Sequence, residues 1–405
     1  MSASLTAGEP FWLVKNGLPE SYLELNESIE VDVVILGVGI TGALIAHSFA
    51  KAGLKVALID KRRIAHGSTA ASTALLQYEI DTPLSELKNQ IGKESAERAY
   101  HLCGEAIEKV GEVARSYPHG CSYMKRPSLY IASAPQDIKF LKEEFNARKE
   151  AGFEVSWIEE DQLKSEYKIH AVAAIRSELG AQVDPYILVH SILGELKKDG
   201  HFIFERTEID TNKIITGDGV VVTSMKGYTV KAKKLIFATG YESEAFIKEK
   251  IVKLKSSYAF VTEKIAEKEI WKDNVLIWDT AKPYIYARTT EDNRILIGGG
   301  DIATRNMHIR DFLIKRKAKK LLRDFKKYMP RNDLKIAFQW TGTFGETEDG
   351  LAYIGELPEW KNCYFALGFG GNGITYSALA GDFMVKLFKG EYPKDLELFR
   401  FGRNK

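Results

Sequence analysis

The sequence predicts an α/β fold in which a domain built on a parallel βαβ unit is combined with an α+β domain on a mostly antiparallel sheet. A continuous apolar strand at 31–36 passes through a glycine turn into a helix and returns as a second strand at 55–60, which is the pattern of a βαβ unit. From about residue 246 to residue 340, aromatic-rich alternating segments such as SSYAFVTE and RILIGGG are typical of antiparallel strands. These two patterns predict two different sheets.

The order of the elements predicts that both domains are discontinuous in sequence. After the βαβ unit come a long helical stretch, the strand SLYIAS, a helix that ends at Gly152, a further helix leading to the strand HFIFE, and the strand in KAKKLIFATG. The tail returns to strand, glycine-rich loop and helix in CYFALGFGGNGITYSALAG. At roughly 150 residues per domain, 405 residues suggest two to three domains, and the two interleaved patterns reduce this to two. We assign residues 1–117, 171–245 and 341–405 to the first domain, and residues 118–170 and 246–340 to the second.

The composition excludes several classes of protein. With 57 Lys and Arg against 55 Asp and Glu, the net charge is +2, so no overall field favours nucleic acid or an anionic membrane. The three cysteines are far apart and the eight histidines lack close ligand spacing, which predicts neither a disulfide framework nor a metal site. Because the chain has neither signal-peptide features nor an apolar run approaching the ~18 residues of a spanning helix, we expect a cytoplasmic protein.

A glycine motif lies at the turn between the first strand and the helix. Gly37, Gly39 and Gly42 form G-x-G-x-x-G, which permits a tight turn, close approach of a diphosphate to the backbone, and close packing of the helix. The helix N-terminus adds free N–H groups and the positive end of the helix dipole. Asp60 ends the second strand about 20 residues further on, where a carboxylate can bond to ribose hydroxyls. These features predict a Rossmann-like dinucleotide site, for FAD or for NAD.

The loop after Asp60, KRRIAHGSTAASTALLQYEID, is rich in small residues that let the backbone approach a flat ring and a diphosphate closely. Here the sequence resembles the D-amino-acid oxidase superfamily of FAD-dependent oxidoreductases, which includes glycine, sarcosine and γ-glutamylputrescine oxidases. The resemblance covers nearly the whole chain and implies FAD, held in a Rossmann-like domain of the glutathione-reductase type. Its further motifs, in order, are the upstream FW, QVDPYILVHSIL, ATGY, PYIYARTTEDNRILIGGGD, WTGTFGETEDGLAYIG and ALGFGGNGITYSALAG.

The resemblance also implies which residues contact FAD. The glycine turn would cradle the pyrophosphate, Asp60 would bind the adenosine ribose, and the segment 62–73 would contact the pyrophosphate, the ribityl chain and the flavin edge. Ile209, in the predicted strand ERTEI, would bind adenine through its backbone. The residues assigned to FAD in this part of the chain are Gly37, Gly39, Ile40, Thr41, Gly42, Asp60, Lys61, Arg62, Gly67, Ser68, Thr69, Ala71, Ser72, Thr73, Leu75, Ile209, Thr239 and Gly240.

The C-terminal segment FGGNG joins a strand to a helix, so its backbone N–H groups and the helix dipole point at whatever lies before them. In the resembled family this is the pyrimidine edge of the flavin, where negative charge develops on reduction and preorganised donors stabilise it. The candidate residues are Gly370, Gly371, Asn372, Gly373 and Ile374. A second nucleotide site is the alternative, but no strand with a terminal acid follows.

The candidate catalytic residues are Tyr284, Tyr286 and Arg288 in the segment PYIYART. Strand alternation places these three side chains on one face of the antiparallel sheet. That face could line the substrate site, and an alternating tyrosine stripe is also typical of a packed core.

Three departures from the resembled family bear on the substrate and on the cofactor linkage. The arginine that binds an amino-acid carboxylate commonly follows W-x-G, where this chain has Thr343 and Phe344, so Arg288 is the candidate replacement. The lysine associated with oxygen reactivity is replaced by Leu296, which leaves the electron acceptor, oxygen or another carrier, open. Covalent branches use His or Cys where this chain has Ala71 and Gly342, so we predict FAD bound without a covalent link.

The function predicted is a flavoenzyme that oxidises a C–N bond of a small amine or N-substituted amino acid by hydride transfer to flavin, after which the imine is hydrolysed. This chemistry requires orientation over the ring and an uncharged amine more than a dedicated base. The alternative is C–O oxidation of a 2-hydroxy acid or polyol by a dehydrogenase of the same superfamily. A flavin-binding subunit whose partner carries the chemistry is the third hypothesis.

Overall fold

The computed structural model describes residues 5–304 and 306–403 and divides into two compact units. The antiparallel unit comprises the chain up to Lys15, Ala71–Asp184 and Leu254–Phe344. The parallel unit comprises Asn16–Ala70, Pro185–Lys253 and the chain from Gly345 on. Within the described ranges, no helix has both the length and the apolar character needed to cross a membrane.

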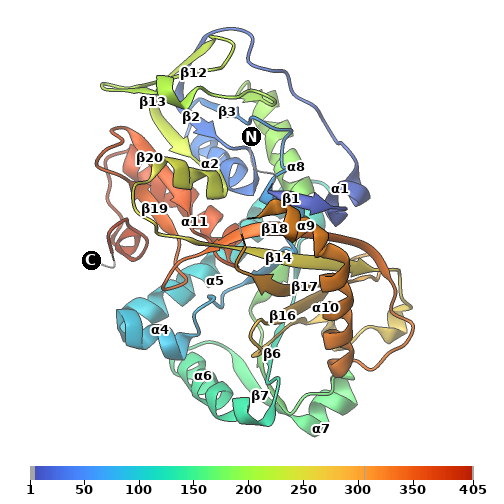
Figure 1. Cartoon of the computed structure of the whole chain (residues 1–405). Helices are drawn as coiled ribbons and strands as arrows, with labels where there is room; N and C mark the ends of the chain where they lie inside the picture. The colour runs from blue at the N-terminus through green and yellow to red at the C-terminus, as the bar shows by residue number, and fades with distance from the viewer. Residues whose placement is uncertain (1–4, 305, 404–405) are drawn as a thin grey trace. The chain divides into compact units, whose positions relative to one another are not determined.

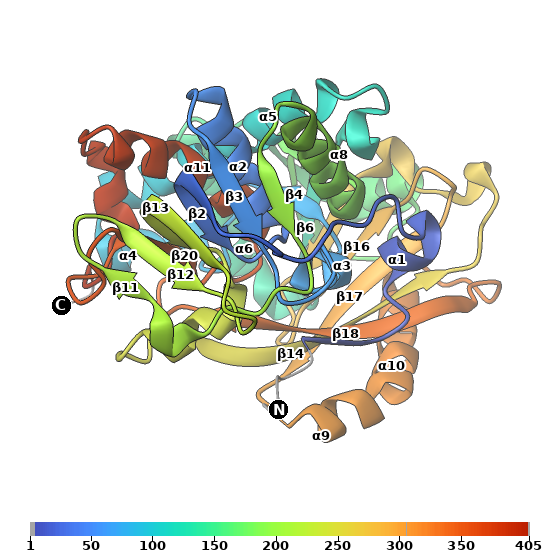
Figure 2. The same cartoon turned by 90° about the horizontal axis from the view of Figure 1, so that it is seen from above.

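The parallel unit is built on a mixed sheet of order β10-β3-β2-β13-β12-β11, in which β20 also pairs with β13 and β19 pairs with β20. Strands β10, β3, β2, β13 and β20 run parallel, whereas β11, β12 and β19 are antiparallel to their neighbours. Figure 2 shows helices α2, α8 and α11 beside one another over this sheet, with α2 in contact with both of the others. The bounds are β2 Ile29–Leu36, α2 Ile40–Lys51, β3 Val56–Ile59, α8 Pro185–Lys198, β10 Phe202–Phe204, β11 Ile215–Thr216, β12 Val220–Thr223, β13 Thr229–Phe237, β19 Tyr353–Glu356, β20 Cys363–Leu367 and α11 Gly373–Phe388.

The central strands of this sheet are buried, which explains why their sequences are continuous apolar runs. Val33, Val34 and Ile35 of β2 are fully buried, and so are Val56, Ala57 and Leu58 of β3. A parallel strand with helices on its face has little contact with water, so its residues need no polar alternation. The glycine turn begins at Gly37, directly after the carboxyl end of β2.

The antiparallel unit contains a sheet of order β1-β18-β14-β17-β16-β15-β6-β8-β7 and a small sheet of order β4-β9-β5. Helix α10 lies against β17, as Figure 1 shows, and α6 contacts β7 and β8. Strand β15 pairs with β6 in parallel. The antiparallel pairs include β1–β18, β14–β17, β15–β16, β16–β17, β6–β8, β7–β8, β4–β9 and β5–β9. The bounds are β1 Thr6–Gly8, α1 Phe11–Asn16, β4 Leu75–Gln77, α4 Leu84–Ile91, α5 Lys93–Arg115, β5 Met124–Lys125, β6 Ser128–Ile131, α6 Ile138–Glu150, β7 Val155–Glu159, β8 Ala173–Ser177, β9 Gly180–Gln182, β14 Lys253–Thr262, β15 Leu276–Asp279, β16 Ile285–Thr289, β17 Ile295–Ile302, α9 Met307–Phe312, α10 Ile314–Tyr328 and β18 Ile336–Glu346.

The structure differs from the sequence prediction in two local elements. ERTEI is not a strand, because β10 ends at Phe204 and Ile209 forms only an isolated bridge with Ser224. The long helical stretch is two helices, since Gly92 lies between α4 and α5 with φ of +86° and interrupts the helical path.

The compact units are bounded differently from the predicted domains. The chain up to residue 15 and residues 71–117, 171–184 and 341–344, which the prediction gave to the FAD-binding domain, belong to the antiparallel unit, whereas residues 246–253, predicted for the substrate domain, belong to the parallel unit. The physical reason is that α5 contacts β4 and β9, whose small sheet belongs to this unit. Which ligand each unit binds is a separate question, and it stays a prediction.

Candidate active site

The glycine turn of the parallel unit is closed by contacts between backbone atoms. Gly37 has φ of +95°, and a Cβ on it would lie 2.4 Å from the carbonyl oxygen of Ala238. A Cβ on Gly42 would lie 2.0 Å from the carbonyl oxygen of Gly37. Because both obstacles are backbone atoms, the turn between β2 and α2 keeps this shape only with glycine at the two positions.

Gly42→Ala is therefore expected to yield protein with less than about a tenth of the normal FAD content, because a methyl group there must push the turn out of the shape that admits a diphosphate. The ratio of flavin absorbance to protein absorbance after purification measures this loss. Gly194→Ala in α8 is the matched control, since a Cβ at that position would have nothing within 4 Å. Equal flavin content in the two variants would contradict the assignment of this turn.

Asp60 lies just beyond the end of β3, and its carboxylate is held by the backbone. Its two oxygens accept hydrogen bonds from the N–H groups of Val38 and Arg62, each at 2.8 Å. Burial raises the pKa of Asp60, and the two N–H groups and the charge of Arg62 oppose that rise. A carboxylate offers about four acceptor sites, so each oxygen retains capacity for a hydroxyl donor.

Lys61 and Arg62, both predicted to contact FAD, form ion pairs with Glu242. The Arg62 guanidinium donates to Glu242 in bidentate fashion at 3.0 and 2.8 Å, and Lys61 Nζ lies 2.7 Å from the same carboxylate. Burial alone would raise the pKa of Glu242, but the bonds from Arg62 and Lys61 outweigh it and lower the pKa. Sequence reasoning missed Glu242, although it lies two residues after the predicted Gly240.

The N-terminal turns of α2 and α11 meet in the parallel unit. Thr41 Oγ1 lies 2.8 Å from Ser377 Oγ, and the N–H of Ile40 donates to Thr69 Oγ1 at 2.9 Å. Asn372 precedes α11, and its carbonyl accepts a bond from Thr375 Oγ1 at 2.8 Å. The structure thus joins the first glycine motif to the helix that follows FGGNG, through a serine that the sequence did not single out.

In the antiparallel unit, Ala71 and Ser72 are held by two tryptophans. Trp12 Nε1 donates to the carbonyl of Ser72 at 2.6 Å, and Trp340 Nε1 donates to the carbonyl of Ala71 at 2.9 Å. A Cβ on Gly342 would lie 2.8 Å from the Cβ of Ala71. Residues that the sequence placed at the flavin edge are therefore fixed by side chains 60 and 269 positions away in the chain.

Tyr286, on β16, adjoins this segment. Burial raises the pKa of its hydroxyl to about 12, while side-chain hydrogen bonds with Ser257 and Thr73 act in the opposite direction. Its ring covers Gly298 of the adjacent strand, and the ring of Tyr284 lies 5.8 Å away. The tyrosine hydroxyl stays protonated at neutral pH and remains a hydrogen-bond donor beside Thr73.

Arg288 is a buried cation without a carboxylate partner in the described part of the chain. Its side chain is 2% exposed, Nη2 donates to the carbonyl of Val183 at 3.3 Å, and Nε has no hydrogen-bond partner among the described residues. The guanidinium carbon lies 5.1 Å from the ring centre of Trp12, the residue that holds Ser72. Burial lowers the pKa of Arg288 to about 10.

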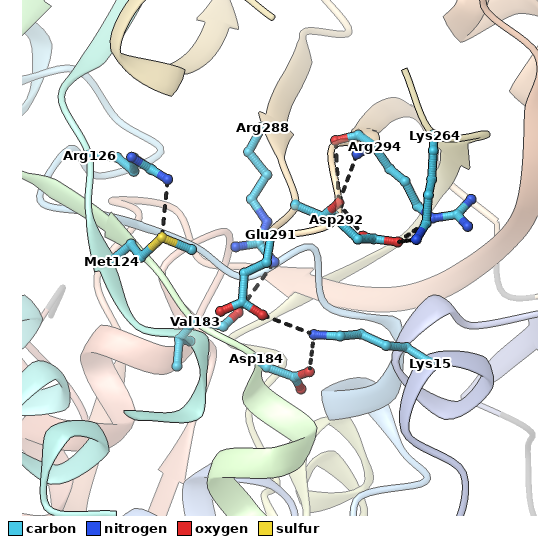
Figure 3. Close-up of polar contacts among 11 residues, drawn as sticks. Lys15, Met124, Arg126, Val183, Asp184, Lys264, Arg288, Glu291, Asp292 and Arg294 are labelled. Carbon is cyan, nitrogen blue, oxygen red and sulfur yellow. Dashed lines mark hydrogen bonds and ion pairs between the residues drawn. The ribbon is translucent and has the colours of Figure 1, made fainter. Parts of the chain in front are cut away.

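The acids nearest to Arg288 are engaged by Lys15, as Figure 3 shows. Lys15 Nζ lies 3.2 Å from Asp184 and 3.7 Å from Glu291, and it also lies over the ring of Trp12. Both acids raise the pKa of Arg288 through space, but this is weaker than the effect of burial. Burying the charge of Arg288 away from water lowers the free energy of unfolding unless a ligand supplies a negative charge.

The remaining predicted positions lie as follows. In the parallel unit, Thr239 Oγ1 lies 2.8 Å from Ser243 Oγ, and Gly240 has φ of +58°. In the antiparallel unit, Thr343 accepts a bond from Arg310 Nη1 at 3.2 Å, and Leu296 is fully buried. Alternation along β18 argues against Arg310 as a replacement for the absent family arginine, since Trp340 and Gly342 contact Ala71 whereas Thr343 contacts Arg310.

Comparison with known proteins identifies the family. The family model described as DAO, FAD dependent oxidoreductase, matches residues 32–387. The chain is 25% identical over 377 residues to gamma-glutamylputrescine oxidoreductase of Escherichia coli strain K12, covering 91% of this chain and 85% of the relative. It is 26% identical over 386 residues to glycine oxidase of Bacillus licheniformis, covering 92% and 97%.

Among solved structures, L-proline dehydrogenase from P. horikoshii superposes with a TM-score of 0.77 at 22% identity, covering 94% of this chain and 100% of that one. At that identity the likeness concerns the fold. The sequence-based resemblance is thereby confirmed, since the family match spans most of the chain. The chain belongs to the DAO family of FAD-dependent oxidoreductases, and its cofactor is FAD.

Proposed function

We propose that this enzyme oxidises the C–N bond of a small amine or N-substituted amino acid whose carboxylate is bound by Arg288. The observation that carries the proposal is the buried Arg288 guanidinium, which no described carboxylate neutralises and which stacks on the tryptophan holding Ser72. Arginine presents paired N–H donors that match a carboxylate. The names of the relatives, which include amine and glycine oxidoreductases, support the same substrate class.

We assign the adenosine and diphosphate portions of FAD to the parallel unit, in a dinucleotide fold of the Rossmann type. The glycine turn leaves no room for a Cβ at Gly42, and the Asp60 carboxylate retains acceptor capacity at the end of β3, so the residues present fit this group. The assignment of residues 71–73 and of the FGGNG segment to the flavin portion stays a prediction from the sequence. When bound, FAD would supply the acceptor for the hydride of the C–H bond beside the nitrogen.

The residues of the chain orient the substrate in this proposal. Arg288 fixes the carboxylate, and the protonated hydroxyl of Tyr286, beside Thr73, can donate a hydrogen bond. Holding the amine in one orientation replaces much of the entropy cost of a bimolecular encounter. The imine product leaves the site and is hydrolysed by water.

Anaerobic titration of the visible flavin band tests the reaction class. We expect N-methyl and other N-substituted amino acids to bleach the band, and amines without a carboxylate to need at least about 100-fold higher concentrations, because only the former engage Arg288. The panel includes 2-hydroxy acids, which would bleach the band first if the enzyme oxidised a C–O bond. Bleaching by no amine at any concentration would reject the proposed reaction, and turnover by the isolated chain excludes a mere flavin-binding subunit.

FAD is expected to leave the protein on acid precipitation. Positions 71 and 342 are Ala and Gly, whose side chains cannot form a bond to the isoalloxazine ring, and the two lie against each other in the structure. The yellow colour should therefore appear in the supernatant, with a pellet that is colourless. A pellet that stays yellow after washing would show a covalent link at another residue.

A further inference from the structure

Arg126 is a second guanidinium group without a carboxylate partner in the part of the chain that the structure describes. It directly follows β5, and its backbone N–H donates to the carbonyl of Gly180 at 2.9 Å. Its Nη2 contacts Met124 Sδ at 3.1 Å, and its buried Nε has no hydrogen-bond partner within residues 5–304 and 306–403. A thioether is a weak hydrogen-bond acceptor and carries no charge, so Met124 does not neutralise the positive charge of Arg126.

The small sheet brings Arg126 toward Arg288. In the β5–β9 pairing Met124 lies opposite Gln182, and the next residue along, Val183, supplies the carbonyl that Arg288 contacts. The Arg126 side chain folds back to Met124 and therefore lies near the same end of β9. Figure 3 draws Arg126, Arg288 and Val183 together, with Met124 beside Arg126.

The electrostatics of the two groups agree with this placement. Burial lowers the pKa of both arginines, and the charge of Arg126 contributes to lowering the pKa of Arg288. Lys15 engages Asp184 and Glu291, the acids that could otherwise neutralise Arg288. Arg288 is buried and Arg126 is partly buried, and neither has a carboxylate partner among the described residues, so placing the two cations near each other is costly unless a ligand supplies negative charge.

A third polar group that lacks a hydrogen-bond partner among the described residues lies on β9. Gln182, which is 1% exposed, has its side-chain oxygen buried without a donor among the described residues. An amide oxygen accepts N–H donors. The two arginines and this oxygen together offer partners for two anionic groups and an N–H group.

We infer that Arg126 and Arg288 form a double-arginine site for an amine that carries two carboxylates, such as an amino acid whose N-substituent ends in a second carboxylate. This inference rests on the proposed function, because it names the substrate class of the same site. Arg288 binds one carboxylate and Arg126 binds the other. Each arginine can do so through paired N–H donors.

Binding of unreactive diacids to the FAD-containing enzyme tests the inference. The ligands are succinate, glutarate and adipate, each compared with its half-amide, which has the same length and one charge fewer. Isothermal titration calorimetry gives the dissociation constants. We expect at least one diacid to bind about 10-fold or more tightly than its half-amide, since a charge-assisted hydrogen bond is replaced by a neutral one.

Arg126→Gln is expected to remove this preference while leaving half-amide binding within about 3-fold of wild type, because Arg288 still binds one carboxylate. Lys125→Gln is the matched control: it removes the same charge from the neighbouring residue, whose ammonium pairs with Glu108 and is 62% exposed. Arg126→Lys, which keeps the charge but not the paired N–H donors, should give an intermediate preference for the diacid over its half-amide. It also serves if the glutamine variant does not fold.

Two results would overturn the inference: equal binding of every diacid and its half-amide by the wild type, or an unchanged preference in Arg126→Gln. The diacids contain no C–N bond, so their binding is independent of the reaction. If diacid preference depends on Arg126 while no amine bleaches the flavin, the proposed reaction is wrong and the anion site stands. If N-substituted amino acids bleach the flavin without any diacid preference, the reaction stands and the second carboxylate is rejected.

Discussion

Replacing Arg288 by methionine is expected to lower kcat/KM for amines that carry a carboxylate by about 10²–10³-fold. Truncating one partner of a buried charge pair costs about 2–5 kcal/mol, and each 1.4 kcal/mol is a factor of ten. Methionine roughly preserves the volume packed against Trp12, so the change removes charge and hydrogen bonds more than packing. Steady-state kinetics with a carboxylate-bearing amine and with its methyl ester measure the effect.

The methyl ester is expected to react with the variant and the wild type at similar rates, because it offers no charge to Arg288. Arg288→Lys should recover part of the loss, since an ammonium keeps the charge but not the paired donors. Lys264→Met is the control for net charge: Lys264 follows β14, is 64% exposed, and its Nζ lies 3.6 Å from Asp292 in the turn between β16 and β17. A uniform loss of activity on acid and ester alike, or reduced FAD content in Arg288→Met, would mean that Arg288 supports the fold instead of the substrate.

Replacing Arg148 by methionine is expected to destabilise the antiparallel unit by about 3–5 kcal/mol, because it leaves buried carboxylates uncompensated. Arg148 is 2% exposed, Nε donates to Glu144 at 2.7 Å, and Nη1 donates to Glu79 at 3.0 Å. At about 2–4 °C per kcal/mol for a unit of this size, the thermal transition should fall by roughly 10 °C. Thermal unfolding followed by circular dichroism at pH 8 measures it.

The pH dependence of this defect has a definite sign. Burial raises the pKa of Glu79 to about 7, above its ordinary value near 4.5, so the protonated acid is the favoured form in the folded protein. The contribution of Glu79 to stability is therefore full below pH 4.5 and is lost as the pH rises through about 7. For Glu144, burial would raise the pKa, but Arg148 and Ser85 outweigh it and lower the pKa, so its contribution is present above pH 4.5 and lost at lower pH.

Without Arg148, both carboxylates lose their counter-charge and are harder to ionise, so the destabilisation should be largest at about pH 8 and smaller at about pH 5.5. Combining Arg148→Met with Glu79→Gln and Glu144→Gln removes all three charges and should recover much of the lost transition temperature. A defect of equal size at both pH values, unrelieved in the triple variant, would show that Arg148 acts through packing alone.

Much of the fold follows from local pattern in this chain. Strand β2 reads as an apolar run because both of its faces are buried, and the adjoining glycines are required where a Cβ would strike backbone atoms. The alternating aromatic segments predicted the antiparallel strands β14 to β17, although β15 and the first six residues of β17 are buried throughout, so burial does not follow the alternation there. ERTEI was predicted as a strand and is not one, because pairing with a neighbour is a non-local event that composition does not report.

The sequence by itself determined the family, the cofactor and the position of the first glycine turn, because each motif is a short run of neighbouring residues and the motifs keep their order along the chain. Only the tertiary structure decided which charges are neutralised. Glu242 pairs with Arg62 from 180 residues away, and Lys15 engages Asp184 from 169 residues away, whereas Arg288 has no such partner in the described residues. Charge compensation depends on distance in space and on burial, and neither can be read from spacing along the chain.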